Sequence, residues 1–245
     1  MREKFRFQQL RARFGRCPIC GLSVFLRFAE SEIGTRCLRC RATPVTLSLV
    51  RALQDALAQQ SKQLTNLHVL ELSSRGALVR YLQRSAAKTT LCEYFDDVPR
   101  GATKNGILCQ DVQRLMFAAA SFDVCTSTEV FEHVPDDAAG FRESYRVLKS
   151  GGLLVFTVPL TAAAQTSERA MLAADGVVHL LPPEFHGDRL RGANKVLCYR
   201  NYGQDILTRV AAAGFCDVRF YDSAKGNEAA WFGYGRWVIV AQKNA

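Results

Sequence analysis

The chain of 245 residues has no apolar run that approaches the ~20 residues of a membrane-spanning helix. The longest candidate, at 151–160, is about half that length and contains Thr157 and Pro159. The first residues lack the apolar core of a signal peptide, so we expect a cytoplasmic protein. Hydrophobic residues make up 48% and charged residues 22%, which excludes a disordered, collagen-like or coiled-coil chain.

Positive charge is concentrated in the first quarter of the chain. Up to Asn66 there are 12 Lys and Arg against 4 Asp and Glu, whereas from Leu67 onward there are 20 against 19. Nearly all of the formal net charge of +9 therefore belongs to the first segment. The balanced remainder is typical of an ordinary soluble enzyme, so the sequence predicts two parts with different roles.

Four of the nine cysteines form two Cys-x-x-Cys pairs in the basic segment: Cys17, Cys20, Cys37 and Cys40. Two such turns bring four thiolates around one ion, and the 16-residue spacer between them is typical of a zinc ribbon. A site closed by four thiolates has no position for water, so we expect structural zinc. A pair of disulfides, which a cytosolic chain rarely forms, and an iron–sulfur cluster are the alternatives. The other five cysteines are scattered and are expected to be small buried residues.

Arginines surround these cysteines at Arg13, Arg16, Arg36, Arg39 and Arg41. One interpretation is that they offset the net negative charge of zinc held by four thiolates. The other is that they contact the phosphates of a nucleic acid. Nucleic-acid binding through the basic module is therefore an open alternative.

Helical periodicity appears twice in the first 66 residues. Phe7, Leu10 and Phe14 predict a short helix whose apolar face packs on the ribbon or the main domain. A second helix is expected at 46–64, where apolar residues recur on one face. The predicted units are a zinc-ribbon module at 1–45, a connecting helix and linker at 46–66, and the main domain at 67–245.

From Leu67 onward, short apolar strands alternate with helical segments. Strands are expected at 68–72, 89–95, 106–109, 121–127, 151–158, 216–221 and 231–241, and helices at 77–84, 135–150 and 202–213. This alternation predicts an α/β fold with a doubly wound parallel sheet, which binds ligands at the carboxyl ends of its strands. Glu71, Glu93 and Asp111 lie at such ends.

Six landmarks follow one another in the main domain. They are Val-Leu-Glu-Leu at 69–72, Glu93, Asp111, Phe-Asp-Val at 122–124 with Glu-Val-Phe-Glu-His-Val at 129–134, Arg-Glu-Ser-Tyr-Arg-Val-Leu-Lys-Ser-Gly-Gly at 142–152, and Ala-Gly-Phe at 213–215. Their order and spacing resemble those of class I S-adenosylmethionine-dependent methyltransferases over about 67–243. The resemblance implies a Rossmann-like seven-stranded methyltransferase sheet, here preceded by the small zinc ribbon, and S-adenosyl-L-methionine as cofactor.

The resemblance also implies a cofactor-binding set. Its members are Glu71, Leu72, Ser73, Gly76, Glu93, Asp111, Val112 and Glu129. Glu93 would accept hydrogen bonds from the ribose diol, and Glu71 would orient the methionine end. Asp111 and the amide of Val112 would meet the adenine. Exposed loop acids and a turn cap are the alternatives for these carboxylates.

One departure from the family pattern lies in the turn after the first strand. The turn reads Ser-Ser-Arg-Gly at 73–76: Ser73 and Arg75 replace the usual glycines, and only Gly76 remains. Glycine lets backbone approach a cofactor without a Cβ clash. The departure therefore supports the alternative of a methyltransferase-like scaffold that binds a partner without catalysis.

A long connection without clear periodicity, at about 160–201, is expected to cover the substrate as a lid insertion. His179 and His186 lie in it, and His133 lies just past the fourth strand. These three histidines are the candidate general bases for catalysis. Metal ligation by His179, Glu184 and His186 is the alternative, although their spacing is irregular.

The sequence thus predicts methyl transfer from S-adenosyl-L-methionine to an acceptor that it does not identify. The polar lid favours a small polar molecule or a glycan. RNA held by the zinc ribbon, and a non-catalytic zinc-binding interaction protein, are the alternatives.

Overall fold

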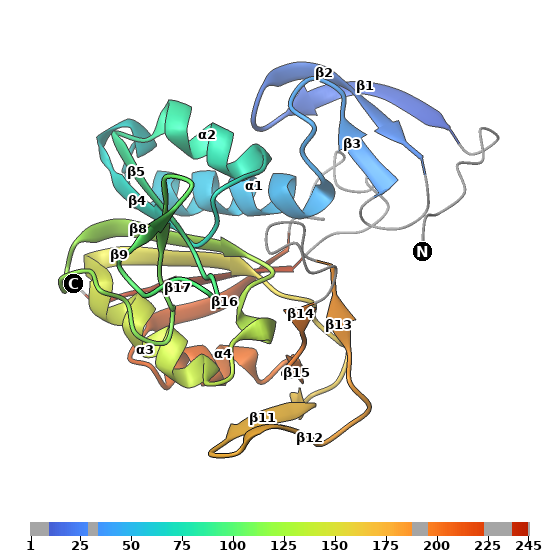
Figure 1. Cartoon of the computed structure of the whole chain (residues 1–245). Helices are drawn as coiled ribbons and strands as arrows, with labels where there is room; N and C mark the ends of the chain where they lie inside the picture. Colours follow the sequence, from blue (N-terminus) through green and yellow to red (C-terminus); the bar gives the residue numbers. More distant parts are fainter. Residues whose placement is uncertain (1–9, 29–33, 188–195, 223–236, 245) are drawn as a thin grey trace.

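The computed structural model describes residues 10–28, 34–187, 196–222 and 237–244 (Figure 1). Its N-terminal part is an antiparallel sheet of order β1-β2-β3, with bounds β1 (Arg11–Cys17), β2 (Gly21–Arg27) and β3 (Thr35–Cys37). β1 pairs with β2 over its whole length, from Arg11 opposite Arg27 to Cys17 opposite Gly21. The hairpin therefore places the first cysteine pair at its tight end.

The helix expected around Leu10 and Phe14 is wrong for the described residues. Phe14 lies in β1 opposite Val24, and its side chain is 67% exposed rather than packed on a core. Strand pairing satisfies the backbone polar groups of this segment, and this outweighs three apolar residues at helical spacing. Phe7 lies outside the described residues.

Eight strands form the main sheet in the order β16-β17-β9-β8-β4-β5-β7-β6. Their bounds are β4 (His68–Glu71), β5 (Lys88–Glu93), β6 (Thr103–Lys104), β7 (Ile107–Cys109), β8 (Phe122–Thr128), β9 (Leu148–Thr157), β16 (Cys216–Asp222) and β17 (Trp237–Gln242). The five central strands β7, β5, β4, β8 and β9 run parallel, and β17 is antiparallel to its neighbours. The prediction of a doubly wound parallel core is confirmed. The eighth strand, absent from the predicted seven, is β6, which pairs antiparallel with β7 at the edge.

Helices cover both faces of this sheet (Figure 1). The bounds are α1 (Pro44–Gln59) and α2 (Ala77–Ser85) on one face, and α3 (Asp137–Val147) and α4 (Ile206–Ala211) on the other. Successive strand residues point to opposite faces. In β9, Leu154 and Phe156 pack in the core beneath α3 and α4, whereas Leu153 and Val155 pack in the core beneath α1 and α2.

Helix α1, predicted as a connection, is a layer of this packing. It begins at Pro44 because the Thr43 side chain accepts a hydrogen bond from the amide of Thr46, and proline suits the first helical turn. Leu49 and Leu53 are fully buried against the strands. After α1, a short 3-10 helix, η3 (Leu64–Asn66), leads into β4.

Between β9 and α4 the chain forms three small antiparallel pairs. They are β10 (Ser167–Glu168) with β15 (Arg200–Asn201), β11 (Ala170–Ala173) with β12 (Gly176–His179), and β13 (Phe185–His186) with β14 (Val196–Leu197). The β11-β12 hairpin projects from the body of the molecule (Figure 1). We call this segment, residues 160–201, the insertion. In the described part of the chain, no helix has the length and apolarity to cross a membrane.

Candidate functional site

The acidic residues predicted as the cofactor site lie on neighbouring strands. β4 ends at Glu71 and β5 at Glu93, while Asp111 follows β7 and Glu129 follows β8. In the sheet β8, β4, β5 and β7 are consecutive and parallel, so their carboxyl ends meet at one edge. The strand order reverses at β4, which creates the switch point where doubly wound sheets bind ligands.

Glu71 is fully buried at this switch point. The hydroxyl of Ser73 donates to its Oε1 at 2.5 Å, and the hydroxyl of Thr126 donates to its Oε2. Burial raises the pKa of Glu71 to about 7, although both hydroxyls favour the charged form. The carboxyl therefore sits near its midpoint at neutral pH, where an approaching cation favours ionisation.

The turn at 73–76 is hydrogen-bonded to both Glu71 and Glu93. Ser74 donates its backbone N–H and its hydroxyl to Oε2 of Glu93, each at 3.2 Å. The buried Leu72 donates its amide to the carbonyl of Thr126 at 3.0 Å. Gly76 has a φ of 113°, a conformation that favours glycine, and a Cβ there would meet nothing within 4 Å. Ser73, which replaces one of the family's glycines, and its neighbour Ser74 thus bind the strand-end carboxylates, and Gly76 stands where the backbone favours glycine.

Asp111 is held within its own turn. Oδ1 accepts from the backbone N–H of Gln113 at 2.9 Å, and both carboxylate oxygens face the Gln113 amide nitrogen. The adjacent Val112 is buried in the core beneath α3. This turn follows β7, two strands away from β4.

Glu129 has a φ of 55°, in the left-handed region that side chains rarely adopt. Its amide donates to the carbonyl of Thr157 at 3.0 Å, which fastens the end of β8 to β9. Strained backbone of this kind is concentrated at functional sites.

Two of the three predicted catalytic histidines meet beyond the end of β8. His133 lies in a 3-10 helix, η4 (Phe131–His133), and His186 ends β13; their ring centres are 4.9 Å apart at 89°. Oε1 of Glu132, a residue only 1% exposed, lies 3.6 Å from Nε2 of His133 and 3.8 Å from Nδ1 of His186. We call Glu132, His133 and His186 the imidazole–carboxylate cluster. His179 ends the exposed β12 and lies outside this cluster.

Sequence reasoning missed Glu132, although it quoted the Glu-His pair as part of the fourth-strand motif. Its signal was a carboxylate directly before a candidate base in an otherwise apolar segment. Burial, which the sequence does not give, distinguishes it from an ordinary loop acid.

Arg200, 3% exposed, fastens the insertion to the loop after β8. Its guanidinium donates to the carbonyls of Phe131, Val134 and Pro135 at 3.1, 2.5 and 2.7 Å. It also donates to Glu168 at 3.0 Å. The insertion is therefore held against η4 and the residues that follow it.

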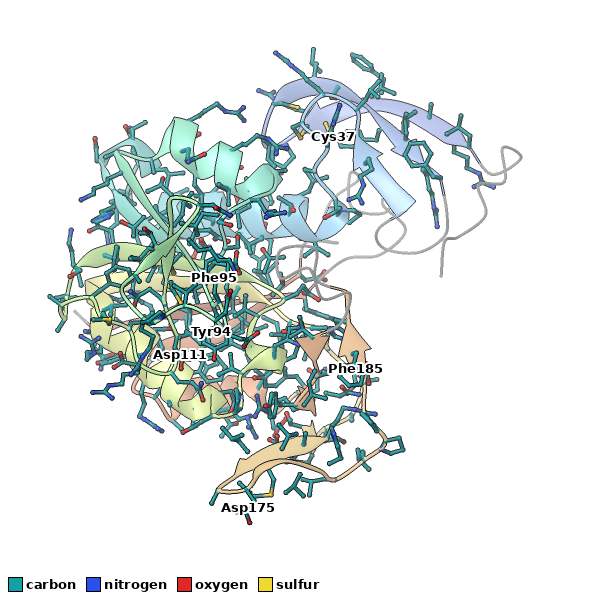
Figure 2. The ribbon with its side chains drawn as sticks, in the orientation of Figure 1. Cys37, Tyr94, Phe95, Asp111, Asp175 and Phe185 are labelled. Carbon is teal, nitrogen blue, oxygen red and sulfur yellow. The ribbon has the colours of Figure 1, made fainter. Side chains whose placement is uncertain are left out.

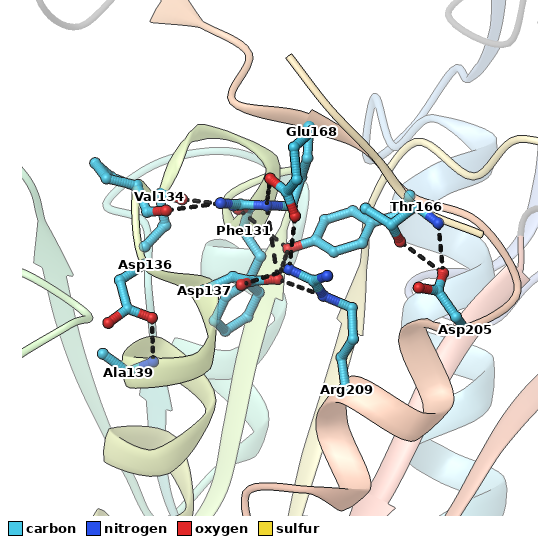
Figure 3. A network of polar contacts seen from close by, with 12 residues as sticks. Phe131, Val134, Asp136, Asp137, Ala139, Thr166, Glu168, Asp205 and Arg209 are labelled. Atoms are coloured by element: carbon cyan, nitrogen blue, oxygen red, sulfur yellow. Dashed lines mark hydrogen bonds and ion pairs between the residues drawn. The ribbon is translucent and has the colours of Figure 1, made fainter. Parts of the chain in front are cut away.

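The carboxylate of Asp137, at the start of α3, continues this network. It accepts from the hydroxyl of Tyr202 at 2.9 Å and from the guanidinium of Arg209 at 2.9 and 3.0 Å. Arg209 of α4 also donates to Glu168 of the insertion at 2.9 Å, so its guanidinium lies between the two carboxylates (Figure 3). The charges in this buried network thus compensate one another across three segments.

The four cysteines predicted as zinc ligands converge at the tight ends of the N-terminal sheet. Their sulfurs lie within 4.8 Å of one another, with 3.7 Å between Cys17 and Cys40 and 3.5 Å between Cys20 and Cys37. Sulfurs on one tetrahedral zinc, with Zn–S near ~2.3 Å, are about 3.8 Å apart. A disulfide needs about 2.05 Å, so four free thiols that fit one ion are present instead of two disulfides. Figure 2 labels Cys37 in this sheet, apart from Asp111 and Phe185.

A cleft of about 570 Å³ separates the cysteine turns from α2. Its lining residues are Ile19, Cys20, Arg39, Cys40, Arg41, Ala77, Arg80 and Arg84. Two of its arginines donate hydrogen bonds to the cysteine turns. Arg39 donates to the carbonyl of Cys20 at 2.9 Å, and Arg80 donates to the carbonyl of Cys40 at 3.0 Å. Part of the basic charge therefore stabilises the turns themselves.

Residues 70–156 match the family model described as a methyltransferase domain. A ubiquinone biosynthesis O-methyltransferase from Coxiella burnetii is 28% identical over 149 residues, which cover 57% of this chain and 63% of that protein. A protein of the same name from Xanthomonas oryzae is 30% identical over 153 residues, covering 58% and 60%. The chain thus spans less than two thirds of the length of these relatives.

Two solved structures have a similar fold. An S-adenosylmethionine-dependent methyltransferase from Mesorhizobium loti aligns with a TM-score of 0.52 and 17% identity, covering 80% of this chain and 98% of that one. An amino pentose methyltransferase from Micromonospora echinaspora, solved with S-adenosylmethionine bound, aligns with a TM-score of 0.53 and 12% identity, covering 84% and 94%. At these identities the likeness concerns the fold. Residues 70–156 thus match a methyltransferase domain in sequence, and the chain has a fold similar to that of S-adenosylmethionine-dependent methyltransferases.

Proposed function

We propose that the chain transfers the methyl group of S-adenosyl-L-methionine to an oxygen of a small polar molecule or glycan. The observation that carries this proposal is the carboxyl edge of the sheet. There Glu71 and Glu93 flank the turn at 73–76, and the imidazole–carboxylate cluster follows β8. Relatives named O-methyltransferases support an oxygen acceptor.

The strand ends offer suitable groups for the cofactor. A carboxylate has about four acceptor sites, so the two hydrogen bonds from Ser74 leave Glu93 capacity for a ribose diol. Glu71 would meet the ammonium group of the methionine end, a cation that favours its ionised form. The adenine would lie at Asp111 and Val112. The cofactor's remaining neighbours would be Leu72, Ser73, Gly76 and Glu129.

When bound, the cofactor supplies an electrophilic methyl group: the acceptor oxygen bonds to this carbon as the carbon–sulfur bond breaks and its electron pair stays on sulfur. The chain mainly aligns the acceptor and excludes water. The insertion would provide the cover, because Arg200 holds it against η4. The acceptor hydroxyl would lose its proton at the imidazole–carboxylate cluster. His179, exposed on β12, has no role in this proposal.

We also propose structural zinc at Cys17, Cys20, Cys37 and Cys40. Their sulfur separations support this, and the arginines beside them would offset the net negative charge of the centre. The bonds from Arg39 and Arg80 to turn carbonyls favour this structural role over a surface for RNA.

Calorimetry with S-adenosylhomocysteine tests the cofactor site. Because one hydrogen bond to a charged acceptor contributes about 1.5–3 kcal/mol, we expect Glu93→Gln to weaken binding by roughly 10- to 100-fold. Asp97→Asn is the matched control, since this exposed acid pairs with Lys104 beyond the end of β5. If the unaltered chain does not bind S-adenosylhomocysteine, the proposal fails and the non-catalytic alternative replaces it.

A further inference from the structure

We propose that Glu132, His133 and His186 bind a divalent transition-metal ion, distinct from the cysteine site. One ligand atom from each lies within 4.8 Å of the others. Two imidazoles and one carboxylate suit zinc, iron(II), cobalt(II) or nickel(II). Three protein ligands leave further coordination positions open, as in catalytic rather than structural metal sites.

The distances within the cluster fit a shared ion better than hydrogen bonds. Oε1 of Glu132 lies 3.6 Å from Nε2 of His133 and 3.8 Å from Nδ1 of His186. Both separations exceed the range of about 2.7–3.2 Å for an N–H···O bond. Two ligands on one tetrahedral zinc, each at ~2.0–2.1 Å, are about 3.4 Å apart. The two separations from Glu132 therefore exceed those of shared ligands by only a few tenths of an ångström, and the two histidine nitrogens lie within 4.8 Å of each other.

The outer nitrogens of both rings have the partners expected of ligating histidines. Nδ1 of His133 lies 2.7 Å from the carbonyl oxygen of Leu197, and Nε2 of His186 lies 3.3 Å from Oε1 of Glu184. A ring nitrogen that donates to an oxygen leaves the other nitrogen with a lone pair. Metal-binding histidines are oriented in this way by a carbonyl or carboxylate behind them. The nitrogens left with lone pairs are the two that lie 3.6 and 3.8 Å from Oε1 of Glu132.

Burial and access support the same assignment. The Glu132 side chain is 1% exposed, and a carboxylate removed from water requires nearby positive charge or strong hydrogen bonds. A dication between the rings would add positive charge beside this carboxylate. The side chains of His133 and His186 are 17% and 32% exposed, so the open side of the cluster reaches solvent. An ion and an acceptor oxygen could enter from that side.

A second set, Glu184, His186 and Cys198, also comes within 4.8 Å and shares His186. It would require the His186 nitrogen that now faces Glu184, and it lacks the fully buried carboxylate. We therefore assign the ion to the first set, and Glu184 to the positioning of His186.

The catalytic role of this ion rests on the proposed function. A hydroxyl bound to a divalent cation is more acidic than a free one. With their lone pairs on the ion, the imidazoles would not themselves accept the proton; the hydroxyl would lose it to solvent at the cluster, and the oxygen would then bond to the methyl carbon as the carbon–sulfur bond breaks. An acceptor with two adjacent oxygens would occupy two open positions.

Metal analysis of the full-length chain, titrated with zinc and then freed of excess metal, tests the site. We expect two zinc ions per chain, one on the cysteines and one on the cluster. His133→Ala and His186→Ala should each retain one, whereas His179→Ala, the matched control on the exposed hairpin, should retain two. Glu184→Gln should lower the affinity for the second ion by about 10- to 100-fold, because His186 would lose the carboxylate that orients it.

Cobalt(II) gives a readout on the unaltered chain, in case a variant fails to fold. Cobalt on thiolates shows strong sulfur-to-metal charge transfer, so the first equivalent should display it and the second should add only weak d–d bands. A single ion in the unaltered chain overturns the proposal, as does thiolate charge transfer from both equivalents. Loss of the second ion in Cys198→Ser but not in His133→Ala would assign it to the other set. S-adenosylhomocysteine binding is measured separately, so failure of the metal site leaves the cofactor proposal standing.

Discussion

The substitution Glu71→Gln should stabilise the protein at alkaline pH while it weakens cofactor binding. Burial raises the pKa of Glu71 from 4.5 to about 7 in the folded chain. Between these values the folded state binds more protons than the unfolded state, so stability falls as pH rises through this window. The full pKa shift corresponds to about 3 kcal/mol of the free energy of unfolding. The protein retains this stability near pH 4.5 and has lost it by pH 8. Gln has nearly the same volume, cannot ionise and still accepts from Ser73 or Thr126.

Urea unfolding at pH 4.5, 6 and 8 measures this difference. We expect the variant to match the unaltered chain at pH 4.5 and to exceed its stability by up to about 3 kcal/mol at pH 8. Asp97→Asn is the control, and its pH dependence should have the opposite sign. Lys104 lowers the pKa of the exposed Asp97 carboxyl, so the stability that the ionised Asp97 contributes is lost as pH falls. A stability difference for Glu71→Gln that stays constant across these pH values would refute the assignment. S-adenosylhomocysteine affinity should fall, since the charge opposite the ammonium is gone.

Cys37→Ser should lose the zinc of the N-terminal sheet and destabilise that sheet, because metal binding there contributes to folding; an absence of zinc in the freshly purified, reduced, unaltered chain would contradict the site. Arg200→Met should cost about 3–5 kcal/mol in urea unfolding, because it removes the donor of the buried carbonyls of Phe131, Val134 and Pro135, and a buried acceptor left without a donor costs about 1–3 kcal/mol. A cost below about 1 kcal/mol would show that the insertion is held by other contacts. Gly76→Ala should lower stability by about 1–3 kcal/mol through backbone strain, since its φ is 113°; unchanged thermal unfolding would show that the turn adapts.

The parallel core was predictable because its signal is local. Strands such as β4 and β8 are short apolar runs, and acids at their ends mark the carboxyl edge. The edge strand β6 was missed because two residues, Thr103 and Lys104, carry no periodicity. The N-terminal strand β1 was misread as a helix because Phe14 and its apolar neighbours fit helical spacing, while strand pairing depends on a partner segment.

The candidate site was predictable only in part for a related reason. Resemblance to a family predicted Glu71 and Glu93, and the structure places them on adjacent strands. All three histidines were candidate bases from the sequence. Tertiary packing brings His133 and His186 together and leaves His179 on an exposed hairpin. Glu132 needed the fold as well, since what makes it distinctive is its burial beside the insertion, where Tyr199 donates its amide to the Glu132 carbonyl.

Helix α1 has a consequence for how the chain can be shortened. It precedes the segment that matches the methyltransferase family, yet its Leu49, Val50 and Leu53 are fully buried in the core with strand residues of the main sheet. Burying each such side chain contributes about 1.5–3 kcal/mol. A truncated chain that began at Leu67 would therefore lose a covering layer and expose a continuous apolar face to water. Such a fragment should aggregate, and a soluble methyltransferase fragment of this protein should begin no later than Pro44.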